Sequence, residues 1–174
     1  MTDSDLARQV RDVSRLTGEF VLRSGRIADE YFDKYQFEAD PVLLDRLAEQ
    51  MAVLVPEGTE VLAGLEMGGI AVVTALARHA KLPTAFVRKQ AKQYGTARLA
   101  EGAEVAGRHV LVVEDVVTSG GQVVVSTNEL RRLGAKVDHA LCVIDRQEGG
   151  AEALSAEGIT LRALLTRADL EAAA

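Results

Sequence analysis

The stretch VLVVEDVVTSGG, residues 110–121, decides the fold and contains the first candidate site. Its apolar run leads into two adjacent carboxylates, Glu114 and Asp115, and then into a short turn of hydroxyls and glycines. Such an apolar strand is typical of a parallel sheet that is buried on both faces. Glycines let a backbone approach a ligand closely, and the first amides of a following helix attract phosphate. The sequence therefore predicts a buried strand, a phosphate-binding turn and a helix, in that order.

The acid pair narrows the choice of ligand. Carboxylates beside a phosphate would repel it, so the pair and the turn are expected to bind different parts of one molecule. An ionised carboxylate only accepts hydrogen bonds, which suits hydroxyl groups. A ribose 5-phosphate meets both demands, and the same acids could help to hold a magnesium ion on that sugar. The turn lacks the GK[ST] ending of a P-loop and the G-x-G-x-x-G pattern of dinucleotide sites.

The alternation of strands and helices predicts an α/β fold with a doubly wound, mainly parallel sheet. Strands are expected at residues 60–64, 84–88, 109–115, 136–145 and 159–166, and helices at 4–16, 41–55, 70–80 and 122–134. Residues 27–37 are expected to form a short strand or hairpin, and Asp40 an N-cap. Ligands of such folds bind at the carboxyl ends of the strands. The charged residues at or just past those ends are Glu66, Arg88, Glu114, Asp115 and Arg146.

Composition excludes several functional classes. The 174 residues suit one domain, and the net charge of -6 does not favour binding to nucleic acid or anionic membranes. The single cysteine, Cys142, cannot form an internal disulfide and is expected in the core. No uninterrupted apolar stretch reaches the roughly 20 residues that span a bilayer, and no signal peptide is recognised. We therefore expect a soluble cytoplasmic protein.

A second anion site is expected in a basic loop. The segment FVRKQAKQYGTAR, residues 86–98, carries Arg88, Lys89, Lys92 and Arg98 and no acidic residue. A basic loop that closes over a charged leaving group is a common catalytic device. The glycine turn EMGG at residues 66–69 offers further backbone contacts. A sugar with phosphate at one end and diphosphate at the other fits both anion sites.

These motifs resemble a known enzyme family. VLVVEDVVTSGG resembles the ribose-phosphate motif of the type I phosphoribosyltransferases. Three other segments resemble the orotate branch of that family: FVLRSGRIADEYFDKY its N-terminal substrate hood, VRKQAKQYGT its catalytic loop, and VIDRQEGG its orotate-binding strand end. The matches run in order over roughly residues 18–150.

The resemblance implies a fold and an activity. Residues 1–174 would form a single type I phosphoribosyltransferase domain, with the hood mainly at 1–40 and the core at about 41–174. Members of the orotate branch transfer the 5-phosphoribosyl group from phosphoribosyl diphosphate to orotate, giving orotidine 5'-phosphate and diphosphate in pyrimidine biosynthesis. It also implies Mg²⁺ as cofactor and a homodimer with shared active sites, in which Lys89 acts on the neighbouring subunit's site.

The resemblance also implies the site residues. The donor would contact Arg88, Lys89, Lys92, Tyr94, Glu114, Asp115, Val116, Val117, Thr118, Ser119, Gly120, Gly121 and Gln122. Orotate would contact Thr118, Arg146, Arg23, Tyr31 and Phe32. The catalytic set would be Arg88, Lys89, Lys92 and Asp115, with Asp115 as the one candidate for touching a substrate-borne magnesium ion.

The chain departs from the family pattern at four positions. Tyr94 stands in place of a histidine, Arg23 in place of a lysine, Gly68 where some members have a lysine, and Glu114 where many have aspartate. The alternatives are a phosphoribosyltransferase for another base, a non-catalytic regulator that senses phosphoribosyl diphosphate, and a Rossmann-like domain with incidental glycine turns. Arg146 and the hood are what favour orotate over another base.

Overall fold

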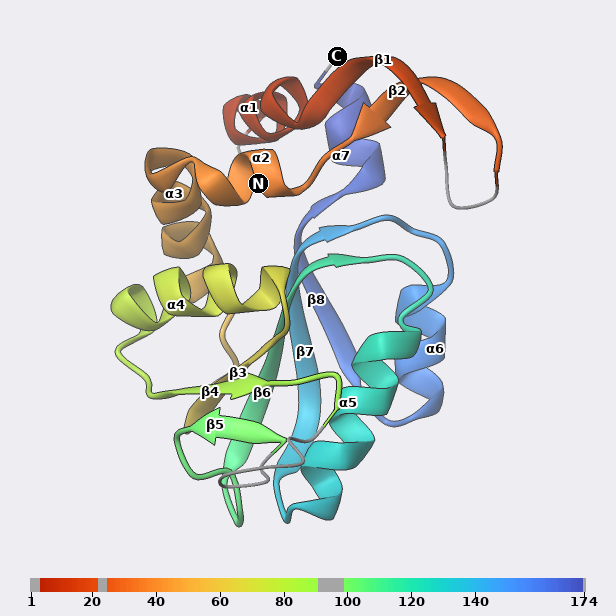
Figure 1. The fold of residues 1–174 in the computed structure, drawn as a ribbon. Helices are drawn as coiled ribbons and strands as arrows, with labels where there is room; N and C mark the ends of the chain where they lie inside the picture. The colour runs from red at the N-terminus through yellow and green to blue at the C-terminus, as the bar shows by residue number, and fades with distance from the viewer. Residues whose placement is uncertain (1–3, 22–24, 91–98, 174) are drawn as a thin grey trace.

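A six-stranded sheet forms the centre of the molecule in the computed structural model, which describes residues 4–21, 25–90 and 99–173 (Figure 1). The strands lie in the order β5-β4-β3-β6-β7-β8, and all neighbours are parallel except the antiparallel pair β4 and β5. Their bounds are β3 Val61–Leu65, β4 Thr84–Val87, β5 Ala100–Gly102, β6 His109–Val117, β7 Lys136–Asp145 and β8 Thr160–Thr166. The predicted doubly wound, mainly parallel sheet is confirmed.

Helices cover both faces of this sheet, as Figure 1 shows. Helices α3 (Pro41–Ala52) and α4 (Gly68–Ala80) lie on one face, and α5 (Gly121–Arg132) and α6 (Gly150–Ala156) on the other. Alternate residues of β6 divide accordingly: Leu111 packs with α3 and α4, and Val112 packs with α5 and α6. The apolar run of β6 is therefore needed because both of its faces are buried.

The N-terminal segments form a layer beyond the carboxyl ends of β6 and β7 (Figure 1). This hood consists of α1 (Ser4–Ser14), the antiparallel hairpin of β1 (Arg15–Val21) and β2 (Ile27–Phe32), and α2 (Tyr35–Ala39). The C-terminal helix α7 (Arg167–Ala172) packs against α1. Val10 and Phe37 are fully buried and belong to the same apolar cluster as α3 and α4.

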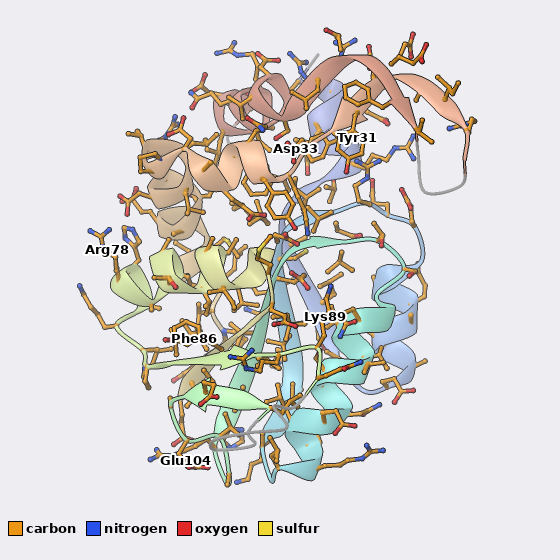
Figure 2. All side chains as sticks on the ribbon, viewed as in Figure 1. Tyr31, Asp33, Arg78, Phe86, Lys89 and Glu104 are labelled. Atoms are coloured by element: carbon orange, nitrogen blue, oxygen red, sulfur yellow. The ribbon has the colours of Figure 1, made fainter. Side chains whose placement is uncertain are left out.

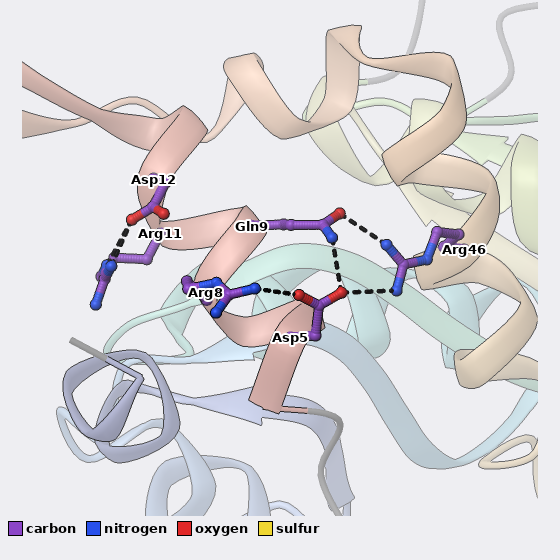
Figure 3. A network of polar contacts seen from close by, with 6 residues as sticks. All are labelled: Asp5, Arg8, Gln9, Arg11, Asp12 and Arg46. Atoms are coloured by element: carbon purple, nitrogen blue, oxygen red, sulfur yellow. Dashed lines mark hydrogen bonds and ion pairs between the residues drawn. The ribbon is translucent and has the colours of Figure 1, made fainter.

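Polar contacts also attach the hood to the core (Figure 3). Arg46 of α3 donates to the Gln9 side chain of α1 at 2.7 Å and lies 3.5 Å from the carboxylate of Asp5. Gln9 donates in turn to Asp5 at 2.8 Å. The buried apolar contacts stabilise the interface, and this network fixes the rotation of α1 on α3.

Most expected elements occur, with shifts at their ends. The predicted N-cap at Asp40 is confirmed, because its side chain accepts from the amides of Val42 and Leu43 at 2.9 and 3.1 Å. Cys142 is fully buried, as expected. The predicted helix 4–16 ends at Ser14, and the predicted hairpin 27–37 is a strand followed by helix α2. Elements β1, β5, α6 and α7 were not predicted. In the described ranges no helix has the length and apolarity to span a bilayer.

Candidate active site

The predicted site residues that the structure describes gather at one edge of the sheet. Arg88 and Lys89 follow β4, and Arg146 follows β7. Glu114 and Asp115, expected at the end of a strand over residues 109–115, lie inside β6, which continues to Val117. The exposed Lys89 is labelled in Figure 2. Arg23, Lys92 and Tyr94 lie outside the described residues, so their predicted roles stay predictions.

The phosphate-binding turn is built by close packing of two glycine loops. Gly120 has a positive φ of 76°, and a Cβ there would lie 2.5 Å from Leu154 and 3.0 Å from the carbonyl of Gly150. A Cβ on Gly150 would lie 2.5 Å from the carbonyl of Thr118. Only glycine therefore fits at both positions.

The amides at the start of α5 are available to a ligand. The Val124 amide donates to the carbonyl of Gly120 at 3.0 Å. The amides of residues 121–123 precede this first helical bond and have no partner inside the helix. Thr118 and Ser119 are exposed beside them. Amides and hydroxyls at the positive end of a helix can cradle a phosphate group.

The turn after β3 packs directly against the acid pair. A Cβ on Gly68 would lie 1.6 Å from Oδ2 of Asp115, and one on Gly69 would lie 2.6 Å from the carbonyl of Val113. The Gly68 position therefore excludes any side chain while Asp115 keeps its place. This geometry gives a physical reason for glycine at a position where some family members have lysine.

Four ionisable side chains meet at the acid pair, and we call them the acid cluster: Lys34, Glu38, Glu114 and Asp115. Asp115 is fully buried, and its Oδ2 lies 2.5 Å from the ammonium of Lys34. This contact is an ion pair without ideal hydrogen-bond alignment. Oδ1 of Asp115 accepts from the Val116 amide at 2.5 Å. Glu114 accepts from the amide of Asp115 at 3.0 Å.

Burial and mutual repulsion set the charges of this cluster. Burial, with the nearby charge of Asp115, raises the pKa of Glu114 to about 9. Burial and the neighbouring carboxylate of Asp115 raise the pKa of Glu38 to about 8. Burial acts to raise the pKa of Asp115, but its close contacts with Glu38, Glu114 and the ammonium of Lys34 outweigh it and the pKa is lowered. The raised pKa values favour the protonated forms of Glu38 and Glu114 near neutral pH, whereas the lowered pKa of Asp115 favours its carboxylate.

Lys34 and Glu38 were missed by the sequence analysis. Both belong to the short helix α2, where Lys34 is the N-cap residue and Glu38 follows four positions later. That spacing puts the two side chains on the same face of a helical turn. The signal was present, but residues 27–37 were interpreted as a strand or hairpin, for which this spacing has no meaning.

Three of the five predicted orotate residues border a cavity of about 490 Å³ between the hood and the core, and Thr118 is not part of its lining. The guanidinium of Arg146 lies 5.6 Å from the ring centre of Phe32, and the ring of Tyr31 lies 5.6 Å from that of Phe20. The amide of Arg146 donates to the carbonyl of Val117 at 2.9 Å, which places it next to Thr118. The structure brings Tyr31, Phe32 and Arg146 together as cavity lining.

Hydrogen bonds hold the backbone at the start of the basic loop. The Arg88 amide donates to the carbonyl of Leu99 at 2.9 Å, and the Lys89 amide donates to the carboxylate of Glu66 at 2.8 Å. Nε of Arg88 is buried and has no hydrogen-bond partner among residues 4–21, 25–90 and 99–173. Glu66 therefore ties the loop after β4 to the glycine turn after β3. Within the same ranges no group of three or more His, Cys, Asp or Glu side chains is placed to hold a metal ion.

Comparison with known proteins defines the class. The sequence profile of the phosphoribosyl transferase domain matches residues 22–157. The chain belongs to the phosphoribosyltransferase family, so the alternative of an unrelated Rossmann-like domain is wrong.

Similar proteins of known name show where the chain belongs within that family. The chain is 51% identical to the orotate phosphoribosyltransferase of Nocardioides sp., over 98% of this chain and 96% of that protein. It is 40% identical to that of Methanocella arvoryzae, over 97% of both. The Mycobacterium tuberculosis orotate phosphoribosyltransferase, crystallised with 5-phospho-α-D-ribosyl 1-diphosphate, superposes with a TM-score of 0.82 at 32% identity, covering 97% of this chain and 98% of that one. The chain is thus a member of the orotate phosphoribosyltransferase group, and the predicted type I fold is confirmed.

Proposed function

We propose that this protein transfers the 5-phosphoribosyl group from phosphoribosyl diphosphate to orotate, releasing diphosphate and orotidine 5'-phosphate. One observation carries the proposal. The glycine cradle at α5, the acid pair of β6 and the Arg146–Phe32 contact lie side by side at one sheet edge, in a chain 51% identical to an orotate phosphoribosyltransferase. Each part suits one portion of the two substrates.

The donor would lie along the end of β6. Its 5-phosphate would accept hydrogen bonds from the amides of residues 119–122, where the helix dipole is positive. Its vicinal hydroxyls would meet Glu114, which is partly exposed, and then Asp115. Its diphosphate would meet the glycine turn at Gly68 and the cations Arg88, Lys89 and Lys92, with Tyr94 as a further hydrogen-bond donor. Support for this arrangement comes from the packing of both glycine turns against β6.

Magnesium fits the oxygen chemistry of the acid pair but not a cage built by the protein. Mg²⁺ prefers carboxylate, phosphate and water oxygens and is often held by one or two carboxylates plus substrate phosphates. Asp115 would supply one carboxylate and Glu114 the other, because a cation beside Glu114 lowers its raised pKa again, and the donor would supply the rest. The metal, when bound, would neutralise charge on the diphosphate.

The protein's own part in the reaction is positioning and charge stabilisation. Displacement at C1 of the sugar builds positive charge on the ring and negative charge on the leaving diphosphate. Preorganised cations lower the free energy of such a transition state. Arg88 and Lys92 would stabilise the diphosphate of their own site. Lys89 would serve the neighbouring subunit's site, so the active protein would be a homodimer. The hydrogen bond from the Lys89 amide to the carboxylate of Glu66 would hold the start of the basic loop in place.

The acceptor would lie in the cavity between hood and core. Arg146 presents a planar fork of donors that matches the carboxylate of orotate. Phe32 and Tyr31 provide ring faces for the base, and Thr118 and Arg23 would add hydrogen bonds. Selectivity for orotate over an uncharged base would depend on Arg146, since a base without a carboxylate leaves that guanidinium with only Glu148, 3.6 Å from its Nε, as an anionic partner.

A spectrophotometric assay tests the proposal. The protein is mixed with Mg²⁺, phosphoribosyl diphosphate and orotate, and the ultraviolet absorbance of orotate is followed. We expect absorbance to fall only when both substrates are present. A parallel series replaces orotate by adenine, guanine, hypoxanthine or uracil and measures diphosphate release. Turnover with one of those bases and none with orotate would refute the assignment, while donor binding without turnover of any base would indicate a regulator.

A further inference from the structure

The acid that the proposed function assigns to the donor is covered by a side chain of the hood. Asp115 has no exposed surface, whereas the Lys34 side chain above it is 35% exposed. Lys34 comes from the N-cap of α2, and Asp115 from the middle of β6. A sugar hydroxyl or a metal ion therefore cannot reach Asp115 in this arrangement.

Only one of the groups around Asp115 can yield to a ligand. Oδ1 is held by the Val116 amide. Oδ2 is enclosed by the backbone at Gly68, by Glu38 and by Lys34. The Gly68 backbone is fixed at the start of α4, and Glu38 is on a helix whose Phe37 is fully buried. Lys34 has a long, partly exposed side chain with free rotations, so its displacement opens Oδ2 with the least rearrangement.

A positive charge is needed beside the carboxylate of Asp115 both before and after the donor binds. An ionised carboxylate that is buried without a partner is strongly unfavourable. In this structure the ammonium of Lys34 provides the compensating charge. A donor that carries Mg²⁺ brings another cation to the same oxygen, so one positive charge can replace the other.

We propose that Lys34 is a positioning residue of the donor site, an internal cation that covers Asp115 until the magnesium-bound donor replaces it. This inference rests on the proposed function. Lys34 competes with the donor for Asp115, so donor affinity is lower than the site would otherwise give. Because Lys34 belongs to the hood, the exchange also makes the hood's contact with β6 depend on the donor.

Calorimetric titration of phosphoribosyl diphosphate at saturating Mg²⁺ tests the exchange. Wild type is compared with Lys34→Ala, Lys34→Arg and Lys136→Ala. Lys136 is the matched control, since it is an exposed lysine at the opposite end of the sheet, where β7 begins. We expect Lys34→Ala to lower the donor Kd at least about fivefold, equivalent to an ion pair of about 1 kcal/mol. Lys34→Arg keeps the cation and is expected to bind no tighter than wild type, and Lys136→Ala to match wild type.

The other outcomes are decisive. Weaker donor binding by Lys34→Ala identifies Lys34 as a direct donor ligand and overturns the exchange, and an unchanged Kd makes it a structural bystander. Steady-state kinetics give a second readout, because under the exchange Lys34→Ala lowers the donor KM and leaves the orotate KM unchanged. If Lys34→Ala does not fold by circular dichroism, Lys34→Gln takes its place. A wild-type protein that binds no donor overturns the proposed function as well, whereas donor binding by wild type with no tightening overturns only the exchange.

Discussion

The guanidinium of Arg146 lies over the ring of Phe32, with 5.6 Å between its central carbon and the ring centre. This contact joins the strand end of β7 to β2 of the hood. It holds the planar fork of Arg146 against one wall of the acceptor cavity, so the fork is oriented before any ligand binds.

Arg146→Lys should weaken orotate binding by about tenfold or more. Lysine retains the charge but loses the paired hydrogen bonds and the flat contact with Phe32. A hydrogen bond to a charged group contributes about 1.5–3 kcal/mol, and at least one is lost. The measurement is the orotate KM at saturating donor, with the donor KM as internal control. An unchanged orotate KM would remove Arg146 from the acceptor site.

Gly68→Ala should destabilise the protein and weaken donor binding. The added Cβ would lie 1.6 Å from Oδ2 of Asp115, so the backbone of α4 or the carboxylate must shift. Overpacking of this kind typically costs about 1–3 kcal/mol in the free energy of unfolding, which denaturant titration measures.

A double variant isolates the cause of that loss. Asp115→Ala removes the carboxylate that the new methyl group would strike. The destabilisation of Gly68→Ala should therefore be smaller in the Asp115→Ala background than in wild type. Equal costs in both backgrounds would show that the close approach to Asp115 is not what requires glycine.

The parts of the site that sequence analysis predicted are local in the chain. The strand, turn and helix of residues 110–132 are encoded by neighbouring residues: an apolar run, two glycines and the helix that follows. Arg146 and Lys89 were proposed in the same way, from segments that follow a buried strand. Local patterns of this kind record what a short segment must bury and where its backbone must turn.

The parts that were missed depend on distant contacts or on short elements. The pairing of Lys34 with Asp115 joins residues far apart in sequence, and no periodicity of either segment records it. Strand β1 is largely exposed and paired only with β2, so its residues lack the apolar alternation of a half-buried strand. Helix α6 buries only Gly150 and Leu154, which is too few for a helical period.

Lys89→Ala should reduce turnover by about 100-fold or more, because a preorganised charge at the leaving group is lost. Donor Kd should change far less than turnover if Lys89 acts mainly in the transition state. The measurement combines single-turnover kinetics with calorimetry. Near-wild-type turnover would remove Lys89 from catalysis.

Mixed dimers test whether Lys89 serves the neighbouring subunit. Lys89→Ala and Asp115→Asn, each inactive alone, are unfolded together, mixed in equal amounts and refolded. In a mixed dimer one site receives an intact Asp115 from its own subunit and an intact Lys89 from the partner. Random pairing should then restore about one quarter of wild-type activity. No recovery, with dimers verified by size, would place Lys89 in its own subunit's site.

The acid cluster should make the protein less stable as pH rises from about 5 to 9. The pKa of Glu38 is raised to about 8 and that of Glu114 to about 9, from an ordinary value of 4.5. Between those values the folded protein keeps protons that the unfolded chain has released, so the free energy of unfolding falls as pH rises. The stabilising contribution of the two protonated acids is complete below about pH 4.5 and is lost as pH rises through the pKa values that they have in the folded protein.

Glu38→Gln keeps a neutral hydrogen-bonding group and should flatten this decline in stability, measured by urea unfolding at pH 5, 7 and 9. Glu57→Gln, an exposed acid outside the cluster, should leave the decline unchanged. An equally steep decline in Glu38→Gln would show that Glu38 is already ionised at neutral pH.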